Sequence, residues 1–405
     1  MILPNKWQII PLEELAEVRS GVTLSQTVIL DGVELPYLRV ANVQDGKIDL
    51  TEIKNVTVEK NKVERFLLKK GDILLTEGGD FDKLGRGAVW QGEIEPCLHQ
   101  NHVFAVRIKG KLLPEFFAAL TRTHHGRTYF LSCAKRSTNL ASINSSQLKR
   151  FPVILPPLAE QKKIAEILST WDEAISAVDK QLENCRLQKK ALMQQLLTGK
   201  NRLPGFSGEW KAKRLSSFCK RITERNNGHC SLVATISAQY GLIRQEEFFN
   251  KSVASETLDN YFLLRKGDFA YNKSYSLGYP MGAIKRLNRY QEAVVTSLYI
   301  CFRLDETKAD SDYFEFFFDS GLLDKSLTQI AAEGGRAHGL LNVRPDDFMG
   351  IQILFPPLEE QKAIASVLST SARQIEMLEQ KLNALQEEKK SLMQQLLTGK
   401  KRVAV

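Results

Sequence analysis

Apolar residues recur at alternating spacings of four and three in two long stretches of the chain, 156–200 and 356–400. Each stretch begins with Pro-Pro, which is tolerated in the first turn of a helix. Each ends with Thr-Gly-Lys, and glycine is common just past the C-terminus of a helix. The pattern therefore predicts two coiled-coil helices of about 40 residues, each roughly 60 Å long at about 1.5 Å per residue.

The apolar residues of each helix form a narrow stripe along one side, the coiled-coil seam. A seam of this length favours pairing of the two helices with each other, and the short link at 201–210 permits such pairing. The alternative is that each helix packs only on its own globular half. Antiparallel pairing would place the two halves at opposite ends, related by a pseudo-two-fold axis. Lys189 and Lys389 interrupt the two seams at the same place. The predicted seam residues are Ile164, Leu168, Trp171, Ile175, Val178, Leu182, Cys185, Leu192 and Leu196 in the first helix, and Ile364, Leu368, Ile375, Leu378, Leu382, Leu385, Leu392 and Leu396 in the second.

The sequence before each long helix has short β-rich runs bounded by turn residues. Runs at 35–40, 71–76 and 102–108 predict strands, and the stretches 115–129 and 312–330 predict helices. His124 and His125 are interpreted as the C-terminal cap of the first of these helices. The predicted fold class is α+β, with mixed α/β domains at 1–155 and 201–355 and long helices in 156–200 and 356–405.

The chain is a tandem duplication with a period of about 200 residues. Aligned without gaps, 156–200 and 356–400 are identical at 24 of 45 positions. The globular halves repeat more faintly, through Trp7 and Trp210 and through the Leu-Lys/Arg-Lys-Gly-Asp segments at 68–72 and 264–268. Constant helices with divergent globular parts indicate a common scaffold that carries two different readers.

Composition adds little to this picture. The net charge of +9, from 56 basic and 47 acidic residues, favours a polyanionic partner without proving one, and the surplus is spread thinly along the chain. The six cysteines lack paired spacing and are expected to be buried thiols. Without a secretory signal or an apolar stretch of ~20 residues, the sequence predicts a cytoplasmic location.

Motifs that carry chemistry are few. Gly85-Arg-Gly87 is not followed by a third glycine at dinucleotide spacing, and no phosphate-loop pattern occurs. Cys97, His99 and His102 could suggest a metal, but no second ligand pair supports it, and packing or polar contacts are expected instead. We therefore expect no catalytic residue, no metal and no cofactor in this chain.

The paired Pro-Pro-Leu-x-Glu-Gln-x-x-Ile-Ala…Leu-Met-Gln-Gln-Leu-Leu-Thr-Gly-Lys helices resemble the specificity subunit of type I restriction-modification systems. The resemblance extends to the Trp near each domain start, the Lys-Gly-Asp turns, and Ile143-Asn144 and Leu341-Asn342 before each final strand. It implies a non-catalytic protein whose two target recognition domains each read half of a bipartite DNA site. It also implies two methyltransferase partners that carry S-adenosylmethionine and methylate adenine at N6, and restriction partners that use ATP and Mg.

Glycine-rich loops between strands, where a backbone can approach DNA closely, are the predicted reading surfaces. They span 76–87 and 271–282, and short polar segments at 135–139 and 334–338 accompany them. Ordinary solvated loops are the alternative. The predicted DNA-contacting residues are Lys83, Arg86, Lys135, Arg136, Asn139, Asn272, Lys273, Tyr275, Tyr279, Arg336 and His338, with Arg39 and Asn42 as weaker candidates.

Two other functions remain open from the residues alone. An enzyme with unrecognised motifs would be active as the purified chain. A coiled-coil scaffold without DNA function would show no sequence-selective DNA binding even beside methyltransferase subunits.

Overall fold

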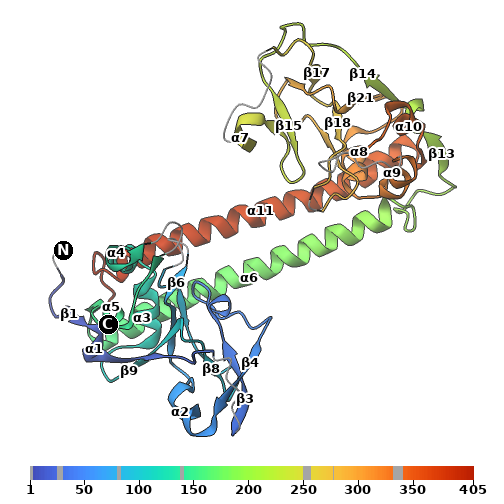
Figure 1. Cartoon of the computed structure of the whole chain (residues 1–405). Helices are drawn as coiled ribbons and strands as arrows, with labels where there is room; N and C mark the ends of the chain where they lie inside the picture. The colour runs from blue at the N-terminus through green and yellow to red at the C-terminus, as the bar shows by residue number, and fades with distance from the viewer. Residues whose placement is uncertain are drawn as a thin grey trace. The chain divides into compact units, whose positions relative to one another are not determined.

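The computed structural model describes residues 3–24, 31–79, 84–136, 141–249, 257–276, 278–331 and 341–405. The chain divides into two compact units: unit 1 comprises Met1–Asp179 and Gln380–Val405, and unit 2 comprises Lys180–Glu379. Each unit therefore contains the first half of one long helix and the second half of the other (Figure 1).

The two long helices are α6 (Leu158–Leu196) and α11 (Leu358–Leu396), which confirms the prediction from the apolar spacing. Both start directly after a Pro-Pro pair. Both are followed by a glycine in the left-handed conformation, Gly199 at φ +70° and Gly399 at φ +73°. Because glycine adopts this conformation at little cost, the Thr-Gly sequence ends each helix.

Unit 1 is a mixed α and β domain in which most neighbouring strands are antiparallel. Its strands are β1 (Gln8–Pro11), β2 (Ala16–Ser20), β3 (Gly32–Leu38), β4 (Lys54–Glu59), β5 (Ile73–Thr76), β6 (Gly78–Gly79), β7 (Gly87–Val89), β8 (Leu98–His99), β9 (Val103–Ile108), β10 (Lys135–Arg136), β11 (Ala141–Ser142) and β12 (Pro152–Leu155). Its shorter helices are α1 (Leu12–Leu15), α2 (Val63–Phe66), α3 (Pro114–Thr121), α4 (His124–Cys133) and α5 (Ser145–Lys149), with 3-10 turns η1 (Val40–Asn42) and η2 (Lys60–Lys62). The strands form sheets in the orders β2–β9–β5–β7, β4–β3–β8, β10–β11–β6 and β1–β12.

Unit 2 repeats this plan. Its strands are β13 (Lys211–Arg214), β14 (Cys219–Ile222), β15 (Ala234–Ser237), β16 (Gly241–Arg244), β17 (Phe262–Arg265), β18 (Phe269–Asn272), β19 (Ala283–Arg286), β20 (Glu292–Val295), β21 (Ile300–Leu304) and β22 (Gln352–Phe355). Its shorter helices are α7 (Gln245–Phe249), α8 (Ser311–Asp319), α9 (Asp324–Ile330) and α10 (Pro345–Gly350), with the 3-10 turn η3 (Leu215–Ser217). The four-stranded sheet β14–β21–β18–β19 has the order of β2–β9–β5–β7, and the pair β13–β22 corresponds to β1–β12.

The strands predicted in the first half are confirmed as β3, β5 and β9, but the two predicted shorter helices are each broken. The stretch 115–129 divides into α3 and α4, because Thr123 caps a new helix with its hydroxyl, which accepts from Gly126 N at 3.3 Å. The interpretation of His124 and His125 as a C-terminal cap is wrong, since both lie in the first turn of α4. The stretch 312–330 divides into α8 and α9 near Gly321, which has a φ of +76°.

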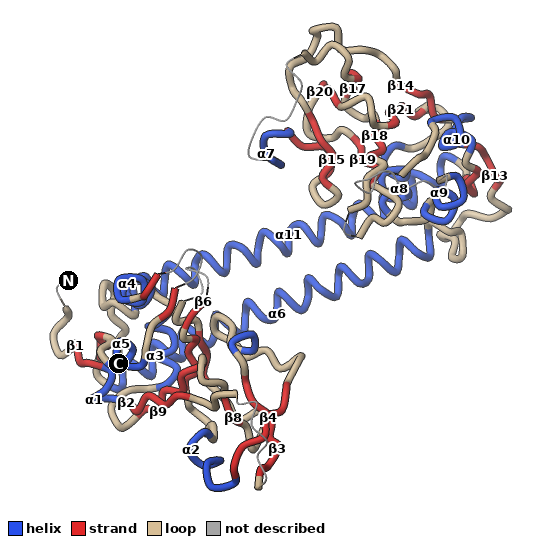
Figure 2. Tube along the Cα trace, viewed as in Figure 1, coloured by secondary structure: helices blue, strands red, loops and turns tan. Residues whose placement is uncertain are grey.

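Each unit has a core to which both long helices contribute. In unit 1, Ile164 and Leu168 from the start of α6 join Met393 and Leu396 from the end of α11 in one apolar cluster with the globular part. In unit 2 the corresponding residues of the other ends, among them Ile364, Leu368 and Leu196, do the same. The helices are therefore antiparallel within each unit, and each packs on both its own and the other globular half. In Figure 2, α3, α4 and α5 lie beside the long helices of unit 1, and β3, β4 and β8 lie away from them.

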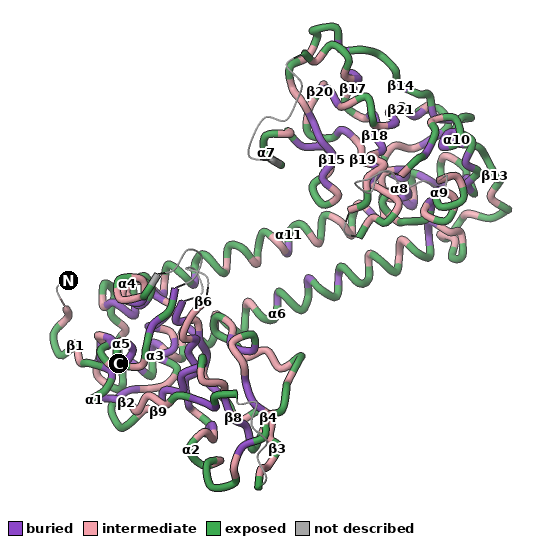
Figure 3. Tube along the Cα trace, in the orientation of Figure 1, coloured by how far each residue is buried: buried purple, intermediate pink, exposed green. Residues whose placement is uncertain are grey.

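The seam positions of α6 and α11 are buried or half-buried, and most residues between them are exposed, as the alternating colours in Figure 3 show. Lys389 lies within the seam with only 6% of its surface exposed, and its Nζ donates to Asp172. Among the helices that the structure describes, none is long and apolar enough to cross a membrane.

Candidate nucleic-acid interface

A buried glutamate near the start of α6 joins the helix pair to the globular part of unit 1. Glu160 Oε2 accepts from Trp7 Nε1 at 3.2 Å and from Arg402 Nε at 3.1 Å. The Glu160 side chain is 1% exposed, and a carboxylate this buried requires charged or hydrogen-bonding partners. These three side chains come from the two ends of the chain and from its middle.

Unit 2 has the same anchor at the start of α11. Glu360 Oε2 accepts from Trp210 Nε1 at 2.9 Å and from Arg202 Nη2 at 2.6 Å, and the carboxylate is fully buried. The hydrogen bonds with Glu360 raise the pKa of Arg202. The same hydrogen-bonded arrangement of tryptophan, glutamate and arginine therefore occurs in both units.

The glutamine that follows each anchor glutamate positions a globular helix. Gln161 Oε1 accepts from Leu113 N at 2.9 Å, and Gln361 Oε1 accepts from Asp310 N at 2.8 Å. Leu113 and Asp310 are the N-cap residues of α3 and α8, so these helices occupy equivalent places in the two units.

The first Lys-Gly-Asp turn is built around a buried aspartate. Asp72 accepts from Lys69 N at 2.8 Å and from Arg107 at 2.8 Å (Nε to Oδ1) and 2.6 Å (Nη2 to Oδ2). Hydrogen bonds with Asp72 raise the pKa of Arg107. Gly71 has a φ of +92°, which favours glycine, so the turn fixes where β5 begins.

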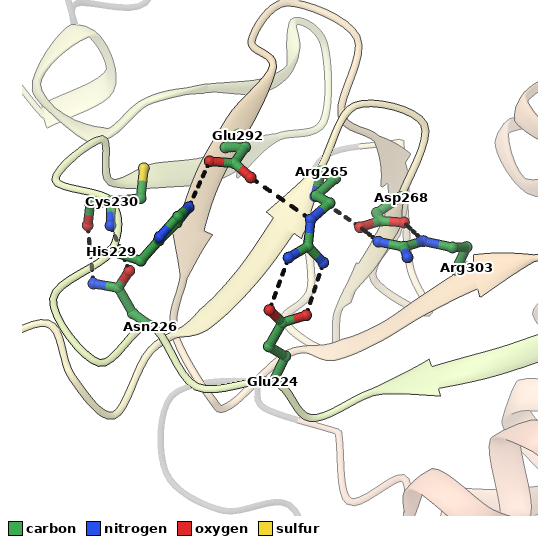
Figure 4. A network of polar contacts seen from close by, with 8 residues as sticks. All are labelled: Glu224, Asn226, His229, Cys230, Arg265, Asp268, Glu292 and Arg303. Atoms are coloured by element: carbon green, nitrogen blue, oxygen red, sulfur yellow. Dashed lines mark hydrogen bonds and ion pairs between the residues drawn. The ribbon is translucent and has the colours of Figure 1, made fainter.

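The second turn repeats this arrangement within a wider polar network (Figure 4). Asp268 accepts from Arg303 Nη2 at 2.8 Å and from Arg265 N at 2.7 Å. The Arg265 guanidinium also makes two 2.8 Å hydrogen bonds to Glu224 and lies 3.6 Å from Glu292. Exposed pairs of this kind stabilise little, so the 1%-exposed Asp268 carboxylate is the group that fixes the turn and the start of β18.

The two predicted reading segments of unit 1 meet in one small sheet. Gly78 and Gly79 of β6 pair with Ser142 and Ala141 of β11, and β11 pairs in turn with β10, which begins at Lys135. A Cβ on Gly78 would lie 2.9 Å from the Ala141 carbonyl oxygen, so glycine permits this close approach. Segments about 60 residues apart in the sequence thereby form one surface at the end of β5.

In unit 2 the same junction forms where β18 ends. Leu341 N donates to the Lys273 carbonyl at 2.9 Å, and Ile143 N donates to the Glu77 carbonyl at 2.9 Å in unit 1. Asn272 Oδ1 accepts from Ser274 N at 3.1 Å, and Lys273 Nζ donates to the Val343 carbonyl at 3.4 Å. The loop after β18 is therefore connected to the chain that leads into α10.

The described candidates in unit 1 differ in exposure. Lys135 is exposed at the start of β10, and the backbone of Arg136 pairs within the same sheet. Arg86 is half-buried, and its Nε has no hydrogen-bond partner among the residues that the structure describes. Lys83, Asn139, Arg336 and His338, and the side chain of Arg136, lie outside the described part of the chain.

In unit 2, Tyr275 is 63% exposed, whereas the other aromatic candidate is engaged. The Tyr279 hydroxyl donates to Asp319 Oδ1 at 2.7 Å and accepts from Lys285 Nζ at 2.9 Å. Burial raises the pKa of Tyr279. Tyr275 is thus the aromatic side chain of this loop that remains open to a ligand.

The two weaker candidates near β3 have local structural roles. Asn42 is 3% exposed, its Oδ1 accepts from Arg39 N at 2.9 Å, and its Nδ2 donates to the Asp49 carbonyl at 2.8 Å. Arg39 Nη2 donates to the Glu52 carbonyl at 3.2 Å. The Asn42 amide therefore holds the loop around η1.

Cys97, His99 and His102 are separated by their environments. His99 is 1% exposed, its Nδ1 donates to the Val103 carbonyl at 2.7 Å, and burial lowers its pKa to about 4. Burial raises the pKa of the Cys97 thiol to about 12. His102 is exposed and its Nδ1 donates to Glu77 Oε2 at 2.6 Å. Within the described residues, no group of three or more His, Cys, Asp or Glu side chains could hold a metal.

The residues that anchor the long helices to the globular parts could be recognised in the sequence only because they are repeated. Glu160, Gln161 and Trp7 recur in the second copy, and this recurrence was a signal that they share a role. Their partners Arg202 and Arg402 also lie at equivalent positions, four residues after Thr198 and Thr398. This equivalence is a further signal in the sequence that the two arginines share a role.

Comparison with known proteins places the chain in a recognised group. The model of the type I restriction modification DNA specificity domain matches twice, at residues 4–184 and 208–387. The putative type I restriction enzyme MjaX specificity subunit of Methanocaldococcus jannaschii is 28% identical over 99% of this chain and 95% of its own length.

Two solved structures share the fold. The HsdS subunit from Thermoanaerobacter tengcongensis matches with a TM-score of 0.51 and 17% identity, over 98% of each chain. A chain from a study described as "Structural basis underlying complex assembly and conformational transition of the type I R-M system" matches with a TM-score of 0.61 and 16% identity, over 98% of this chain and 99% of that one.

Proposed function

The chain belongs to the type I restriction modification DNA specificity family, with two copies of its domain, and from this premise we propose how its two halves divide the work. It is a DNA sequence-specificity subunit and not itself an enzyme. The domains at 1–155 and 201–355 each read one half of a bipartite site in double-stranded DNA. The helical segments 156–200 and 356–405 set the spacing of the two half-sites.

The observation that carries this proposal is the repeated junction at the ends of β5 and β18. In both units a loop after the strand is bonded to the segment before the final strand, through Glu77 and Ile143 in one and Lys273 and Leu341 in the other. The backbone plan is shared while the side chains differ. A scaffold of this kind suits two readers with different sequence preferences.

The proposed contacts follow the physics of DNA recognition. Lysine and arginine side chains neutralise phosphates and position the protein, whereas groups that reach base edges give specificity. Asn42 is withdrawn from direct contact because of its buried local role, and Arg39 remains a weak candidate. The proposed DNA-contacting residues are Lys83, Arg86, Lys135, Arg136, Asn139, Asn272, Lys273, Tyr275, Tyr279, Arg336 and His338.

Docking of two methyltransferase subunits is supported by grooves that the repeat provides twice. In unit 1, Lys389, Lys390 and Met393 line a groove of ≈ 740 Å³. In unit 2, the identical residues Lys189, Lys190 and Met193 line one of ≈ 330 Å³. Residues that were kept alike in both copies suit the same partner bound twice.

The partners would supply the chemistry in a cytoplasmic complex. S-adenosylmethionine would be held by the methyltransferase subunits for methylation of adenine N6, and ATP and Mg by restriction subunits. Because the target adenine must leave the base stack, the reading domains would hold the duplex while the partner enzyme extrudes the base.

The test is removal of positive charge at the junction of unit 1. We expect Arg86→Ala and Lys135→Ala to weaken DNA binding by the assembled complex about 5-fold each and to lower the slope of log affinity against log salt by about 1. Fluorescence anisotropy over a salt series measures both quantities. Lys60→Ala, which changes an exposed lysine paired with Asp31, is the matched control. Unchanged binding and methylation in both variants would contradict the assignment.

A further inference from the structure

The two reading junctions carry different chemistry at matching positions. In the central sheets, Leu75 pairs with Phe104 in unit 1, and Tyr271 pairs with Ile300 in unit 2. Two residues after Leu75 and Tyr271 lie Glu77 and Lys273, and two residues before Phe104 and Ile300 lie His102 and Leu298. Glu77 and Lys273 therefore occupy equivalent positions in the two units, and so do His102 and Leu298.

Backbone hydrogen bonds support this equivalence independently of the register. Val103 N donates to the Gln100 carbonyl at 2.9 Å, and Tyr299 N donates to the Thr296 carbonyl at 3.2 Å, so the turns that contain His102 and Leu298 have the same form.

In unit 1 the junction presents a fixed carboxylate. Glu77 N donates to the His102 carbonyl at 2.9 Å, the Glu77 carbonyl accepts from Ile143 N, and its side chain accepts from His102 Nδ1 at 2.6 Å. The Glu77 and His102 side chains remain 29% and 57% exposed. Because backbone and side chain are both held, the free oxygen lone pairs of Glu77 are oriented before any ligand arrives.

In unit 2 the junction presents apolar surface. Leu298 is 62% exposed and Tyr275 is 63% exposed. Tyr275 lies three residues after the end of β18, and Leu298 lies two residues before Ile300, which pairs with Tyr271 of β18. A single exposed leucine is ordinary on a protein surface. Here it occupies the place where the other copy has His102.

We propose that the two junctions select different groups in the major groove: Glu77, held by His102, accepts from the exocyclic amino group of adenine or cytosine, and Leu298 with Tyr275 contacts the C5 methyl of thymine. The major groove offers these groups, since adenine N6 and cytosine N4 are donors and thymine alone carries a methyl. The proposal rests on the proposed DNA-reading function. It assigns acceptor-based reading to unit 1 and apolar reading to unit 2.

The thymine arm is tested with the wild-type protein. The site is first found by sequencing the DNA methylated by the chain with its methyltransferase partner. Each thymine of each half-site is then replaced by deoxyuridine, which removes only the methyl group. We expect one replacement, in one half-site, to weaken binding about tenfold. The same replacement should have no effect on Leu298→Ala, and Leu354→Ala, which changes another exposed leucine of unit 2, should respond as the wild type does.

The amino-group arm uses Glu77→Gln, which keeps the size of the side chain and replaces one acceptor by a donor. We expect roughly tenfold weaker binding and relaxed preference at one base pair of the other half-site. Glu34→Gln, an exposed glutamate on β3, is the control.

The outcomes separate the two proposals. Sequence-selective methylation that is insensitive to every deoxyuridine replacement and to Glu77→Gln would overturn this inference and leave the reading function intact. So would a site without thymine in either half, or changes by Glu77→Gln and Leu298→Ala in the same half-site. A wild-type complex without any sequence selectivity would overturn the reading function itself.

Discussion

One lysine of the helix repeat has a different neighbour in each unit. In unit 1, Lys389 donates to Asp172 of α6 within the seam. In unit 2, its counterpart Lys189 lies over the ring of Phe316, 5.2 Å from the centroid. Phe316 lies six residues after the N-cap of α8, and the same place in α3 is Ala119.

The comparison shows where the repeat is free to change. The same cation is stabilised by a carboxylate in one unit and by an aromatic face in the other. The buried anchors at Glu160 and Glu360, in contrast, use the same residue types in both units. Mutation of an interaction that both units share should therefore lower the stability of each unit equally. Mutation of an interaction that differs between the units should lower the stability of one unit only.

The largest effect is expected at the shared anchors. Glu160→Ala and Glu360→Ala should each cost about 3 kcal/mol of unfolding free energy in their own unit, because the tryptophan N–H loses its acceptor and the arginine its buried carboxylate. Hydrogen exchange of the core amides of each unit measures this. Glu166→Ala, an exposed change on α6, is the control. Markedly unequal losses would show that the anchors are not equivalent.

The next effect should distinguish the units by pH. Buried His99 matches Val295 of unit 2, and its pKa is lowered to about 4 from the usual value near 6.5. Between these two pKa values His99 is protonated in the unfolded chain but not in the folded unit. The free energy of unfolding of unit 1 is therefore unaffected by His99 above pH ~6.5 and decreases as the pH drops toward ~4. Unit 1 should lose about 2 kcal/mol between about pH 6 and pH 4.5 through this residue.

The control for the pH effect is His99→Val, which introduces the residue of unit 2. Hydrogen exchange followed across the pH series should show a flatter acid profile for unit 1 in this variant, with unit 2 unchanged. An unaltered profile would mean that other groups govern the acid sensitivity.

A smaller effect is expected at the Lys389 pair. Burial lowers the pKa of Lys389, and Asp172 partly offsets this. Asp172→Ala should cost unit 1 about 1.5 kcal/mol, less than for a fully buried pair because the Asp172 side chain is 58% exposed. Chemical denaturation monitored by exchange in unit 1 gives the value, and Lys389→Met in the same background should restore most of it. Failure of that rescue would contradict the role assigned to the charge.

The smallest effect is expected at Phe316. Its replacement by alanine, the residue found at the matching place in unit 1, should cost unit 2 about 1 kcal/mol through the lost cation–π contact and apolar surface. The same exchange measurement applies. Combined with Lys189→Met, the loss should be smaller than the sum of the two single losses, and full additivity would argue against the contact.

The sequence was sufficient for features with a local cause. The apolar spacing and the Pro-Pro and Thr-Gly boundaries located α6 and α11, and the Gly-Asp turn preceded β5 as expected. The break between α3 and α4 was missed, because the apolar pattern continues through Thr123, whose hydroxyl starts a new helix.

The arrangement of the proposed reading segments could be predicted only in part. The loops at 76–87 and 135–139 were chosen from glycine and charge, but their meeting depends on the pairing of Gly78 with Ser142, which no local pattern encodes. The local role of Asn42 was not foreseen for a similar reason, since the carbonyls that accept from its amide lie further along the loop. The partnership of Glu160 with Arg402 spans 242 positions and is set by the packing of the helices.

That partnership has a consequence for the order in which the protein can be finished on the ribosome. Unit 1 needs Met393, Leu396 and Arg402 to complete its core and its anchor, and these residues are synthesised after the whole of unit 2. Unit 2 is contiguous in the chain and can close earlier. The usual sequence in which the N-terminal domain folds first is thus reversed. A chain whose synthesis stops before Met393 would leave the core of its first reading domain incomplete. The apolar surface exposed there could be bound by chaperones or recognised by proteases.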